Sequence, residues 1–549
     1  MIDARANGRA SRVEWLTATA VVTATAVACT WPLALSPWRV PEHQDPLFSI
    51  WRLYQWARNL AAVGAGGWFE GNMFHPTPQV LLLSDITLLP ALVTAPFIAA
   101  GLPPVLAYSA LFWIGLVGAG LAMYAAARVL AATHWAALVA AVLFVGAPTR
   151  MDQVMHFEMF GTAFLPLAVI ATARAMEGRR RPAWAIGAAM AGMALSGIYL
   201  GVFLFTLWPV LAGVEWLRRR GAVDRGVVLR AGASVAIAAL LLVAYARPYR
   251  EIRSLVGDRQ ADEVARYSAT WASYLHAPPV SRAWGWTAPA GGPELWLFPG
   301  LTGSVLAATA LASPAAPWVA SLAVTTLVAA DASRGSHGLV YPVLWQYLEP
   351  YRGLRVPARF GLVALATWSL LAAIGATAVA RRWRPGTGRT AAGALVLALM
   401  AVESAADVNV RRLPSDAPPV YTFLGHLPPT VIAHAPLPDP AALPGAESDF
   451  IYFAQYHRHR LVNGNSGFFP PAYVRLLEAA RDLPGDRAMG ALRAAGVEYL
   501  VVHERYFPSP DAMADTIYRL ERRHDLQPQG TFADEAGTGS ARIYRLLPP

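Results

Sequence analysis

The stretch PEHQDPLFSIWRLYQWARNL, residues 41–60, follows directly on an apolar run at 15–37. It places three titratable side chains just ahead of a group of tryptophan and tyrosine residues. The titratable residues are Glu42, His43 and Asp45. Large aromatic rings of this kind prefer the boundary between water and lipid. The stretch therefore indicates that the chain leaves a membrane here and keeps charged groups at the membrane surface.

Composition supports a membrane protein. Of the 549 residues, 55% are hydrophobic and only 15% are charged, whereas a soluble domain carries about 25% charged residues. Low charge and repeated long apolar runs predict a polytopic, all-α membrane domain. The single Cys29 lies inside the first apolar run, which excludes a disulfide framework and a thiolate metal site. Nothing in the chain resembles a nucleic-acid-binding module.

The apolar runs predict eleven transmembrane helices. They lie at 15–37, 104–127, 134–149, 157–176, 183–200, 201–217, 227–246, 295–313, 315–331, 359–380 and 390–406. Arg5, Arg9 and Arg12 precede the first run, which is too long for a cleaved signal peptide. We expect a signal anchor with a cytoplasmic N-terminus, in the bacterial cytoplasmic (inner) membrane.

One further apolar stretch, LLLSDITLLPALVTAPFIAAGL at 81–102, has two interpretations. If it crosses the membrane, the basic clusters at 179–181 and 218–220 face outward. If it lies along the outer surface, both clusters and the arginines Arg381, Arg382, Arg384 and Arg389 face the cytoplasm, as short arginine-rich loops do. We therefore predict an outer juxtamembrane helix, which places 38–103, 150–157, 247–294 and 331–358 outside.

The same topology places everything after about residue 410 outside. The predicted domains are a multi-span membrane domain at 1–410, with a catalytic first outer loop at 38–103, and an extracytoplasmic α/β domain at 411–549. Two segments in the latter are typical of strands and three are typical of helices. These are TVIAHAPL and GVEYLVVHE as strands, and PAYVRLLEAARDL, DRAMGALRAAG and DAMADTIYRLERRH as helices.

The short outer turn TRMDQVMHFEMF holds four charged or titratable residues, namely Arg150, Asp152, His156 and Glu158. On a helix the last three sit on neighbouring faces about one turn apart. Ionisable groups held at the edge of the hydrocarbon are costly and are functional candidates by default. An aspartate there could act as a general base or hold a divalent cation through its oxygens.

These features resemble the GT-C superfamily of membrane glycosyltransferases. The resemblance rests on an acidic first outer loop after span one and on GNMFHPTPQVLLLSD at 71–85, an N-x-F-x-P segment ahead of a juxtamembrane helix. It covers residues 14–380 and is one of layout more than of strict motif. It implies transfer of a sugar from a polyprenyl-phosphate carrier, with Asp45 matching the essential aspartate of that loop.

Two more positions follow from the resemblance. Some members add acidic metal ligands in the next outer turn, where Asp152 and Glu158 would hold a divalent cation, Mg²⁺ or Mn²⁺. The paired D-x-D form is absent at Asp45, because EHQD spaces its acids three apart, so metal use stays open. Late relatives also carry an outer segment similar to YRGLRVPARF at 351–360, which supplies Arg355 and Arg359.

The implied chemistry gives each residue an expected role. Asp45 would deprotonate the acceptor hydroxyl as it attacks. Planar guanidinium groups suit the departing phosphate better than ammonium groups do. The expected substrate-binding residues are Glu42, His75, Asp85, Arg150, His156, Arg355 and Arg359. The expected partners are a polyprenyl-phosphate-linked sugar, an envelope acceptor that is a glycan, lipid or protein, and membrane lipids, with no nucleic acid.

Each assignment has a structural alternative. Asp45 could cap a helix that begins at Pro46, and Asp85 could cap the juxtamembrane helix. The turn around Asp152 could be a salt-bridged turn, and Arg355 and Arg359 could anchor to lipid phosphates. The whole chain could also be a transporter or an assembly factor for envelope polysaccharide. Transporters keep charges inside their spans and show inverted repeats, so the outer-loop charges favour the enzyme.

Overall fold

The computed structural model describes residues 11–62, 67–85, 87–289, 292–382, 386–535 and 539–548. Arg5, Arg9 and Arg384, which the topology prediction uses, lie outside these residues. Internal packing divides the chain into two compact units. Unit 1 comprises 1–37, 110–246 and 258–410, and unit 2 comprises 38–109, 247–257 and 411–549.

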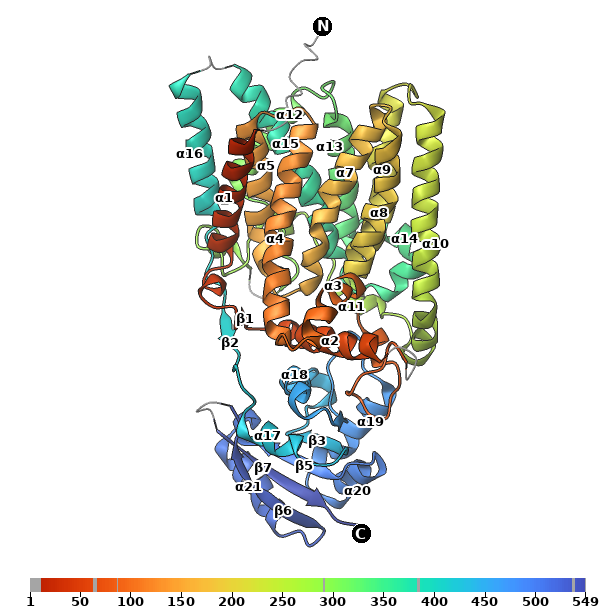
Figure 1. Ribbon diagram of the computed structural model, residues 1–549, viewed down its shortest axis with the longest axis vertical. Coiled ribbons are helices and arrows are strands. Elements are labelled where there is room, and N and C mark those ends of the chain that lie inside the picture. The colour runs from red at the N-terminus through yellow and green to blue at the C-terminus, as the bar shows by residue number, and fades with distance from the viewer. Residues whose placement is uncertain are drawn as a thin grey trace. The chain divides into compact units, whose positions relative to one another are not determined.

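Long apolar helices that run side by side make up most of unit 1 (Figure 1). They are α1 (Arg12–Cys29), α4 (Pro104–Val129), α5 (His134–Gly146), α7 (Phe164–Met176), α8 (Arg180–Ser196), α9 (Ile198–Arg218), α10 (Arg225–Val256), α12 (Leu301–Leu311), α13 (Val319–Ser333), α15 (Phe360–Arg381) and α16 (Thr387–Glu403). Helix α15 packs against α5, α12 and α13 and is buried on nearly every face. A helix that is apolar all round takes such a central place.

Every predicted span coincides with a helix of the structure. Among the described residues, six helices are long and apolar enough to cross a membrane. They are Pro104–Val129, His134–Asp152, Phe157–Met176, Ile198–Arg218, Arg225–Val256 and Pro357–Arg381. Helix α12, with 11 residues, reaches about 17 Å at 1.5 Å per residue, which is less than the roughly 30 Å of hydrocarbon. The protein is an integral membrane protein, and the number of eleven spans stays a prediction.

The first helix is shorter than predicted. The apolar run at 15–37 predicts one helix, but α1 ends at Cys29. Pro32 has no N–H with which to continue the helical hydrogen-bond ladder to Ala28. The chain therefore turns through Thr30 into a short 3₁₀ helix at Leu33–Leu35.

Short elements connect the long helices of unit 1. Helix α6 (Pro148–Asp152) and the 3₁₀ helix η3 (Phe157–Ala163) follow α5. Helices α11 (Ala261–Arg266) and α14 (Val340–Tyr347) lie in the two later connections. Residues 152–158 do not form one continuous helix, so the helical spacing considered for Asp152, His156 and Glu158 does not apply: α6 ends at Asp152, where the Gln153 N–H bonds to the Arg150 carbonyl in a tight i→i−3 turn.

Unit 2 contains a five-stranded sheet in the order β4-β3-β5-β7-β6. The strands are β3 (Val431–Ala435), β4 (Arg460–Leu461), β5 (Tyr499–His503), β6 (Leu526–Ala533) and β7 (Ser540–Leu546). Strands β4, β3 and β5 are parallel, with Ile432 opposite Leu461 and Tyr499. Strand β7 runs antiparallel to both of its neighbours, β5 and β6. Strands β3 and β5 are almost wholly buried, as apolar strands of a covered parallel sheet are.

The helices in residues 411–549, called the tail below, confirm the elements that the sequence patterns predict there. They are α17 (Pro419–Gly425), α18 (Glu447–His457), α19 (Pro471–Ala479), α20 (Asp486–Ala494) and α21 (Pro510–Glu521). Both predicted strands and all three predicted helices are present, within a few residues of their expected ends. Apolar residues at helical spacing in α19, α20 and α21 bury one face each, which is why the pattern identified them.

The first outer loop packs with the tail as part of the same unit. Helix α2 (Gln44–Ala61) packs against α18. The Phe74 N–H donates to the Asn463 carbonyl at 3.0 Å, and the Leu461 N–H donates to the Asn72 carbonyl at 2.8 Å. Strands β1 (Arg39–Pro41) and β2 (Val410–Arg412) form a separate two-stranded sheet. The functional division at 410/411 stays a prediction.

The ambiguous stretch at 81–102 forms a short helix in unit 2. Helix α3 covers Leu88–Ala99, with 12 residues, and follows the 3₁₀ helix η2 at Val80–Leu83. Twelve residues span about 18 Å, too little to cross about 30 Å of hydrocarbon. The length of α3 supports the juxtamembrane interpretation.

Candidate functional site

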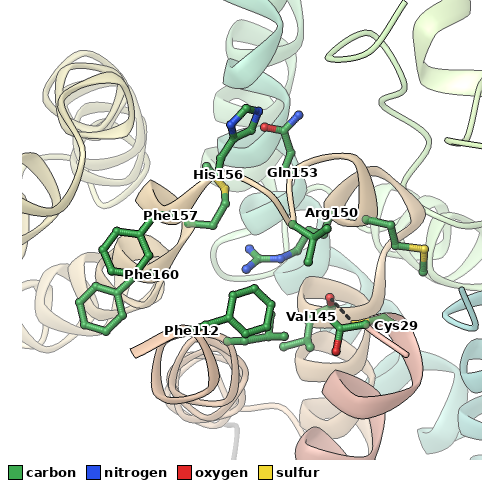
Figure 2. A pocket seen from close by; sticks show the side chains of 13 residues that line it. Cys29, Phe112, Val145, Arg150, Gln153, His156, Phe157 and Phe160 are labelled. Atoms are coloured by element: carbon green, nitrogen blue, oxygen red, sulfur yellow. Dashed lines mark hydrogen bonds between the residues drawn. The ribbon is translucent and has the colours of Figure 1, made fainter. Parts of the chain in front are cut away.

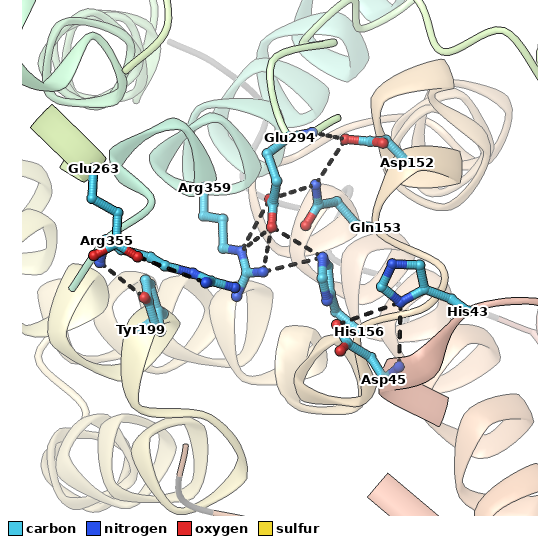
Figure 3. A network of polar contacts seen from close by, with 10 residues as sticks. All are labelled: His43, Asp45, Asp152, Gln153, His156, Tyr199, Glu263, Glu294, Arg355 and Arg359. Atoms are coloured by element: carbon cyan, nitrogen blue, oxygen red, sulfur yellow. Dashed lines mark hydrogen bonds and ion pairs between the residues drawn. The ribbon is translucent and has the colours of Figure 1, made fainter. Parts of the chain in front are cut away.

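A buried glutamate, Glu294, is the centre of a polar network in unit 1 (Figure 3). It lies in the connection before α12, and its backbone N–H donates to Asp152 Oδ2 at 2.7 Å. Its φ of 75° lies in the left-handed region, which residues other than glycine rarely adopt. The Phe298 carbonyl, four residues on, accepts the Thr149 N–H at 3.1 Å, so this connection is fastened to the start of α6.

The Glu294 carboxylate binds three side chains. Arg359 Nε lies 3.1 Å and 3.2 Å from its two oxygens, and Arg359 Nη2 also donates to it. His156 Nε2 lies 3.1 Å from Glu294 Oε1, and Gln153 Nε2 donates to Oε2 at 3.0 Å. The network therefore joins α6, the start of η3 and the start of α15, which are far apart in the sequence.

His156 Nε2 lies beside both a hydrogen-bond acceptor, the Glu294 carboxylate, and a hydrogen-bond donor, Arg359 Nη2. It lies 3.1 Å from Glu294 Oε1 and 3.1 Å from Arg359 Nη2. With a proton on Nε2 the ring donates to Glu294, and without one it accepts from Arg359. Since one nitrogen cannot do both, the protonation of His156 decides which of the two neighbours it stabilises.

Glu294 is ionised at neutral pH. Burial alone would raise its pKa, but Arg359 and then His156 hold the pKa well below its ordinary value. Its side chain is 10% exposed and that of Arg359 is 9% exposed. A charge-assisted pair this deeply buried fixes both side chains. Arg359 is mostly buried and paired with Glu294, unlike an exposed arginine that anchors to the phosphates of the surrounding bilayer, and its role in binding a substrate stays a prediction.

Arg355 belongs to a second group beside the first. Its backbone N–H donates to the Tyr199 hydroxyl at 3.0 Å, and the Tyr199 ring lies 5.0 Å from the Arg359 guanidinium. Its own guanidinium lies 5.6 Å from the Tyr267 ring centre and 3.8 Å from Glu263. With 39% of its side chain exposed, Arg355 is more accessible than Arg359.

Arg150 lines an apolar pocket in unit 1 (Figure 2). Its Nη2 donates to Thr162 Oγ1 at 3.2 Å, and its guanidinium lies 5.0 Å from the Phe144 ring centre. Within the part of the chain that the structure describes, Nη1 has no hydrogen-bond partner. The other lining residues are Cys29, Thr30, Phe112, Leu116, Val145, Met151, Gln153, Val154, His156, Phe157, Met159 and Phe160.

The two predicted metal ligands have different surroundings. Asp152 Oδ2 accepts hydrogen bonds from the Glu294 N–H and from Gln153 Nε2 at 3.2 Å. Glu158 lies in η3 against Gly197. No group of three or more His, Cys, Asp or Glu side chains that could hold a metal ion occurs among the described residues. Metal binding by Asp152 and Glu158 stays a prediction.

Asp45 lies in unit 2, in the first turn of α2. The helix is capped by His43, whose Nδ1 accepts the Asp45 N–H at 3.2 Å. The alternative that Asp45 is itself the cap is therefore wrong. A carboxylate in the first turn is stabilised by the helix dipole, and the Asp45 side chain is 38% exposed.

The other first-loop candidates also lie in unit 2. Glu42 is exposed. The His75 N–H donates to the Leu461 carbonyl at 2.8 Å, and burial followed by the charge of Arg460 lowers the pKa of His75. The Asp85 carbonyl accepts from Arg52 Nη1 at 3.2 Å. Thr87, not Asp85, occupies the N-cap position of α3, so the capping alternative for Asp85 is wrong.

Sequence reasoning missed the residue that organises the network. Glu294 stands in GGPELWLFPG, a single charge within an aromatic and apolar stretch ahead of a span. That isolation was the available signal, because a lone carboxylate at a span end is costly unless it is paired. Gln153 and Tyr199 gave no signal, since their roles depend on Glu294 and Arg359 lying nearby.

Comparison with solved structures identifies the fold. The chain superimposes on the cryo-EM structure of the arabinofuranosyltransferase AftD from Mycobacteria with a TM-score of 0.62 and 18% identity, over 99% of this chain and 40% of AftD. The R1389S mutant of AftD gives 0.62 in one class, at 16% identity over 99% and 42% of the two chains, and 0.57 in another, with the same identity and coverage. The predicted resemblance to the GT-C superfamily is thus confirmed at the level of the fold.

The chain spans less than half the length of the AftD chain that it matches. No family model matches it. No curated protein sequence matches it either.

Proposed function

We propose that this protein is a membrane glycosyltransferase that moves a sugar from a polyprenyl-phosphate carrier to an envelope acceptor on the extracytoplasmic face. A solved protein that shares its fold is an arabinofuranosyltransferase, which supports sugar transfer as the reaction class. Fold alone does not decide function, so the proposal depends on the site.

The observation that carries the proposal is the buried charge network of unit 1. Asp152, His156 and Arg359 sit at the ends of helices long enough to cross a membrane, and Glu294, which binds His156, Arg359 and Asp152, lies in the connection before the shorter helix α12. Charged groups held at this depth are maintained against a solvation cost, and they mark the places where a membrane protein handles charged substrates. A phosphate that lies at the lipid boundary is such a substrate.

The chemistry assigns a role to each group. The acceptor hydroxyl oxygen forms a bond to the anomeric carbon of the sugar while the bond from that carbon to the phosphate oxygen breaks. The hydroxyl proton passes to the Asp45 carboxylate, and the carrier leaves as polyprenyl phosphate with one additional negative charge. Arg355 and Arg359 stabilise that charge through guanidinium contacts. General-base catalysis of this kind contributes about 10²–10⁴ in rate.

A divalent cation is the one cofactor that the superfamily layout suggests for Asp152 and Glu158. A hard cation needs several oxygen ligands, and the described residues offer no group of three acidic or histidine side chains. Asp152 Oδ2 is also engaged by two hydrogen-bond donors. The proposed sugar transfer needs only the side chains of the protein, the donor and the acceptor.

Sugar transfer by membranes that contain the full chain tests the proposal. Polyprenyl-phosphate sugars serve as donors, and product is measured with Asp45→Asn beside the wild type. Asp515→Asn is the matched control, because Asp515 is a carboxylate in α21 with 65% of its side chain exposed. We expect Asp45→Asn to lose transfer by about 10²–10⁴ and Asp515→Asn to retain it.

The outcomes separate the alternatives. Full transfer by Asp45→Asn would remove the assigned base. No transfer by the wild type from any polyprenyl-phosphate sugar would overturn the enzyme and favour a transporter or an assembly factor. Cysteines at 45 and 355, assayed for cross-linking in the otherwise cysteine-free Cys29→Ser background, test whether the base and the phosphate-binding arginines act in one site.

A further inference from the structure

We infer that Glu294 is the positioning residue of this site, which orients Arg359 toward the phosphate of the lipid carrier. The inference rests on the proposed function and assigns a role to a residue that the sequence patterns did not single out. Glu294 reaches its partners through both its backbone and its side chain, and each provides separate support.

The backbone of Glu294 is held in an unfavourable conformation. A φ of 75° brings Cβ close to the backbone in every residue except glycine, and such strain persists where the surrounding contacts impose it. Here the Glu294 N–H points at Asp152 Oδ2, 2.7 Å away. Strained residues of this kind cluster at functional sites, and this one aims its carboxylate at Arg359 and its N–H at Asp152 simultaneously.

The side-chain contacts leave one edge of Arg359 for a substrate. Glu294 engages Nε and Nη2, and Nη2 also meets His156 Nε2 at 3.1 Å. The Tyr199 ring lies 5.0 Å from the guanidinium carbon and restrains the guanidinium through a cation–π contact. With Nε and Nη2 occupied, we assign the two N–H groups of Nη1 to the phosphate oxygens. A guanidinium fixed in orientation loses less freedom on binding than a mobile one.

The negative charge of Glu294 also determines which edge of the Arg359 guanidinium is available to bind phosphate. A neutral glutamine keeps the length of the side chain but leaves the buried guanidinium without a counter-charge, so its Nε and Nη2 edge competes for the incoming phosphate. A shorter aspartate keeps the charge and cannot reach Arg359 from the same backbone position. Both variants therefore disturb the orientation of Arg359, in different ways, and should change the kinetic constants. If Glu294 were important only for folding, its substitution would change mainly the unfolding temperature.

The test uses three variants of the full chain, Glu294→Gln, Glu294→Asp and Glu294→Gly. Glycine relieves the strained φ, so comparing Glu294→Gly with Glu294→Gln separates the backbone strain from the loss of the carboxylate. The matched control is Glu403→Gln, because the Glu403 carboxylate accepts from the N–H and hydroxyl of Thr302 at 3.1 Å and 2.8 Å in the same unit. The measurements are kcat, KM for the polyprenyl-phosphate donor, KM for the acceptor, and the unfolding temperature.

We expect Glu294→Gln to raise the donor KM and to lower kcat, so that kcat/KM for the donor falls by 10- to 100-fold. The acceptor KM should stay within twofold of wild type. Because Glu294 acts through Arg359, the double variant Glu294→Gln/Arg359→Gln should be no worse than Arg359→Gln alone. Glu294→Gly removes the same counter-charge as Glu294→Gln but relieves the strained φ, so it should unfold no lower than Glu294→Gln and still lose turnover. Glu403→Gln should keep both kinetic constants.

Two results would overturn the inference while leaving the proposed function in place. One is a wild-type donor KM and kcat in the Glu294 variants, and the other is additive losses in the double variant. A separate measurement, equilibrium binding of polyprenyl phosphate to the purified protein, does not depend on catalysis. If the wild type binds this lipid but transfers no sugar, the proposed function fails, and weaker lipid binding by Glu294→Gln still supports the positioning role.

Discussion

The backbone N–H of Glu294 donates a 2.7 Å hydrogen bond to the carboxylate of Asp152, which stands 142 positions earlier in the chain. Asp152 is the last residue of α6, and Glu294 precedes α12. The bond therefore ties together two connections between helices that no local sequence pattern relates. Gln153 strengthens the tie, since its Nε2 donates to both carboxylates at 3.2 Å and 3.0 Å.

Substitutions at Asp152 should separate hydrogen bonding from metal binding. In Asp152→Asn the amide oxygen can still accept the Glu294 N–H, whereas Asp152→Ala leaves that buried donor without a partner. We expect the alanine variant to lose about 1–3 kcal/mol of unfolding free energy and the asparagine variant to lose less than half as much. Thermal unfolding of the purified protein measures both.

A sugar-transfer assay with and without added divalent cation is the second measurement for the Asp152 variants. If Asp152 only holds the Glu294 N–H, Asp152→Asn keeps sugar transfer and added Mg²⁺ or Mn²⁺ changes nothing. Transfer that depends on the cation in the wild type and is lost in Asp152→Asn would instead support the metal-ligand prediction.

Glu215 should stabilise the packing of the end of α9 against the start of α13. It is fully buried near the end of α9 and receives Arg219 Nε at 2.8 Å, Arg218 Nε at 3.3 Å and the Ser321 hydroxyl at 2.7 Å. Glu215→Gln removes the counter-charge of two arginines. Because those arginines are about one-third exposed, we expect a loss of about 1–3 kcal/mol, below the usual cost of breaking a fully buried pair.

The control for Glu215 is Glu177→Gln. Glu177 pairs with Arg174 at 3.0 Å, with 36% of the glutamate side chain exposed, so its loss should cost about 0–1 kcal/mol. Equal shifts in the unfolding temperature of the two variants would show that burial of Glu215 contributes nothing.

Glu447 should make the stability of the tail depend on pH. It is buried in α18, where burial raises its pKa to about 8, although hydrogen bonds from Tyr473 and Asn463 oppose the shift. Between its ordinary pKa near 4.5 and 8 the folded state keeps a proton that the unfolded state has lost. Stability therefore falls as pH rises through this window, by up to about 1.4 kcal/mol per pH unit.

Glu447→Gln removes the titration and keeps an oxygen for Tyr473 and Asn463. The unfolding temperature of this variant, relative to wild type, should rise steadily from pH 5 to pH 8 and stay level above pH 8. A constant difference between the two proteins across this range would contradict a raised pKa for Glu447.

Asn463 should couple the tail to the first outer loop. Its side chain accepts the His434 N–H at 2.7 Å and donates to the His434 carbonyl at 3.0 Å, which continues the β3 ladder beyond the end of β4. Its carbonyl accepts the Phe74 N–H at 3.0 Å. In Asn463→Leu both His434 groups lose their partner, so we expect a loss of about 1–3 kcal/mol for each.

The coupling predicts where the effect of Asn463→Leu appears. Limited proteolysis should cut the first outer loop around Phe74 faster, even though the substitution lies in the tail. Asn465→Ala, which removes one hydrogen bond to Ser448, is the control and should leave that loop protected. Faster cutting confined to the tail would contradict the coupling.

Local patterns predicted the elements well because their causes are local. The apolar runs that predict spans coincide with helices such as α4, α9 and α15, since lipid and a helical bundle both reward continuous apolar segments. In the tail, alternation and helical spacing located β3, β5 and α19 to α21. Boundaries were less certain, and Pro32 ended α1 earlier than hydropathy alone predicts.

The candidate site was predicted only in part. The chain does bring Asp152, His156 and Arg359 together in unit 1, as their charges at span ends suggested. The helical spacing considered for Asp152, His156 and Glu158 does not apply, because α6 ends at Asp152, and Glu294 makes the connection to Asp152 instead. The role of Asp45 stays a prediction, although His43 rather than Asp45 caps α2.

The sequence by itself determined that this protein is a bundle of apolar helices with a mixed tail and charged connections between helices, because hydropathy and periodicity act over a few residues at a time. Only the tertiary structure decided that Glu294 joins Asp152 to Arg359 and that residues 38–109 pack with the tail. Those arrangements depend on hydrogen bonds and packing between segments more than a hundred positions apart, and no local preference encodes which distant partner will satisfy a buried charge.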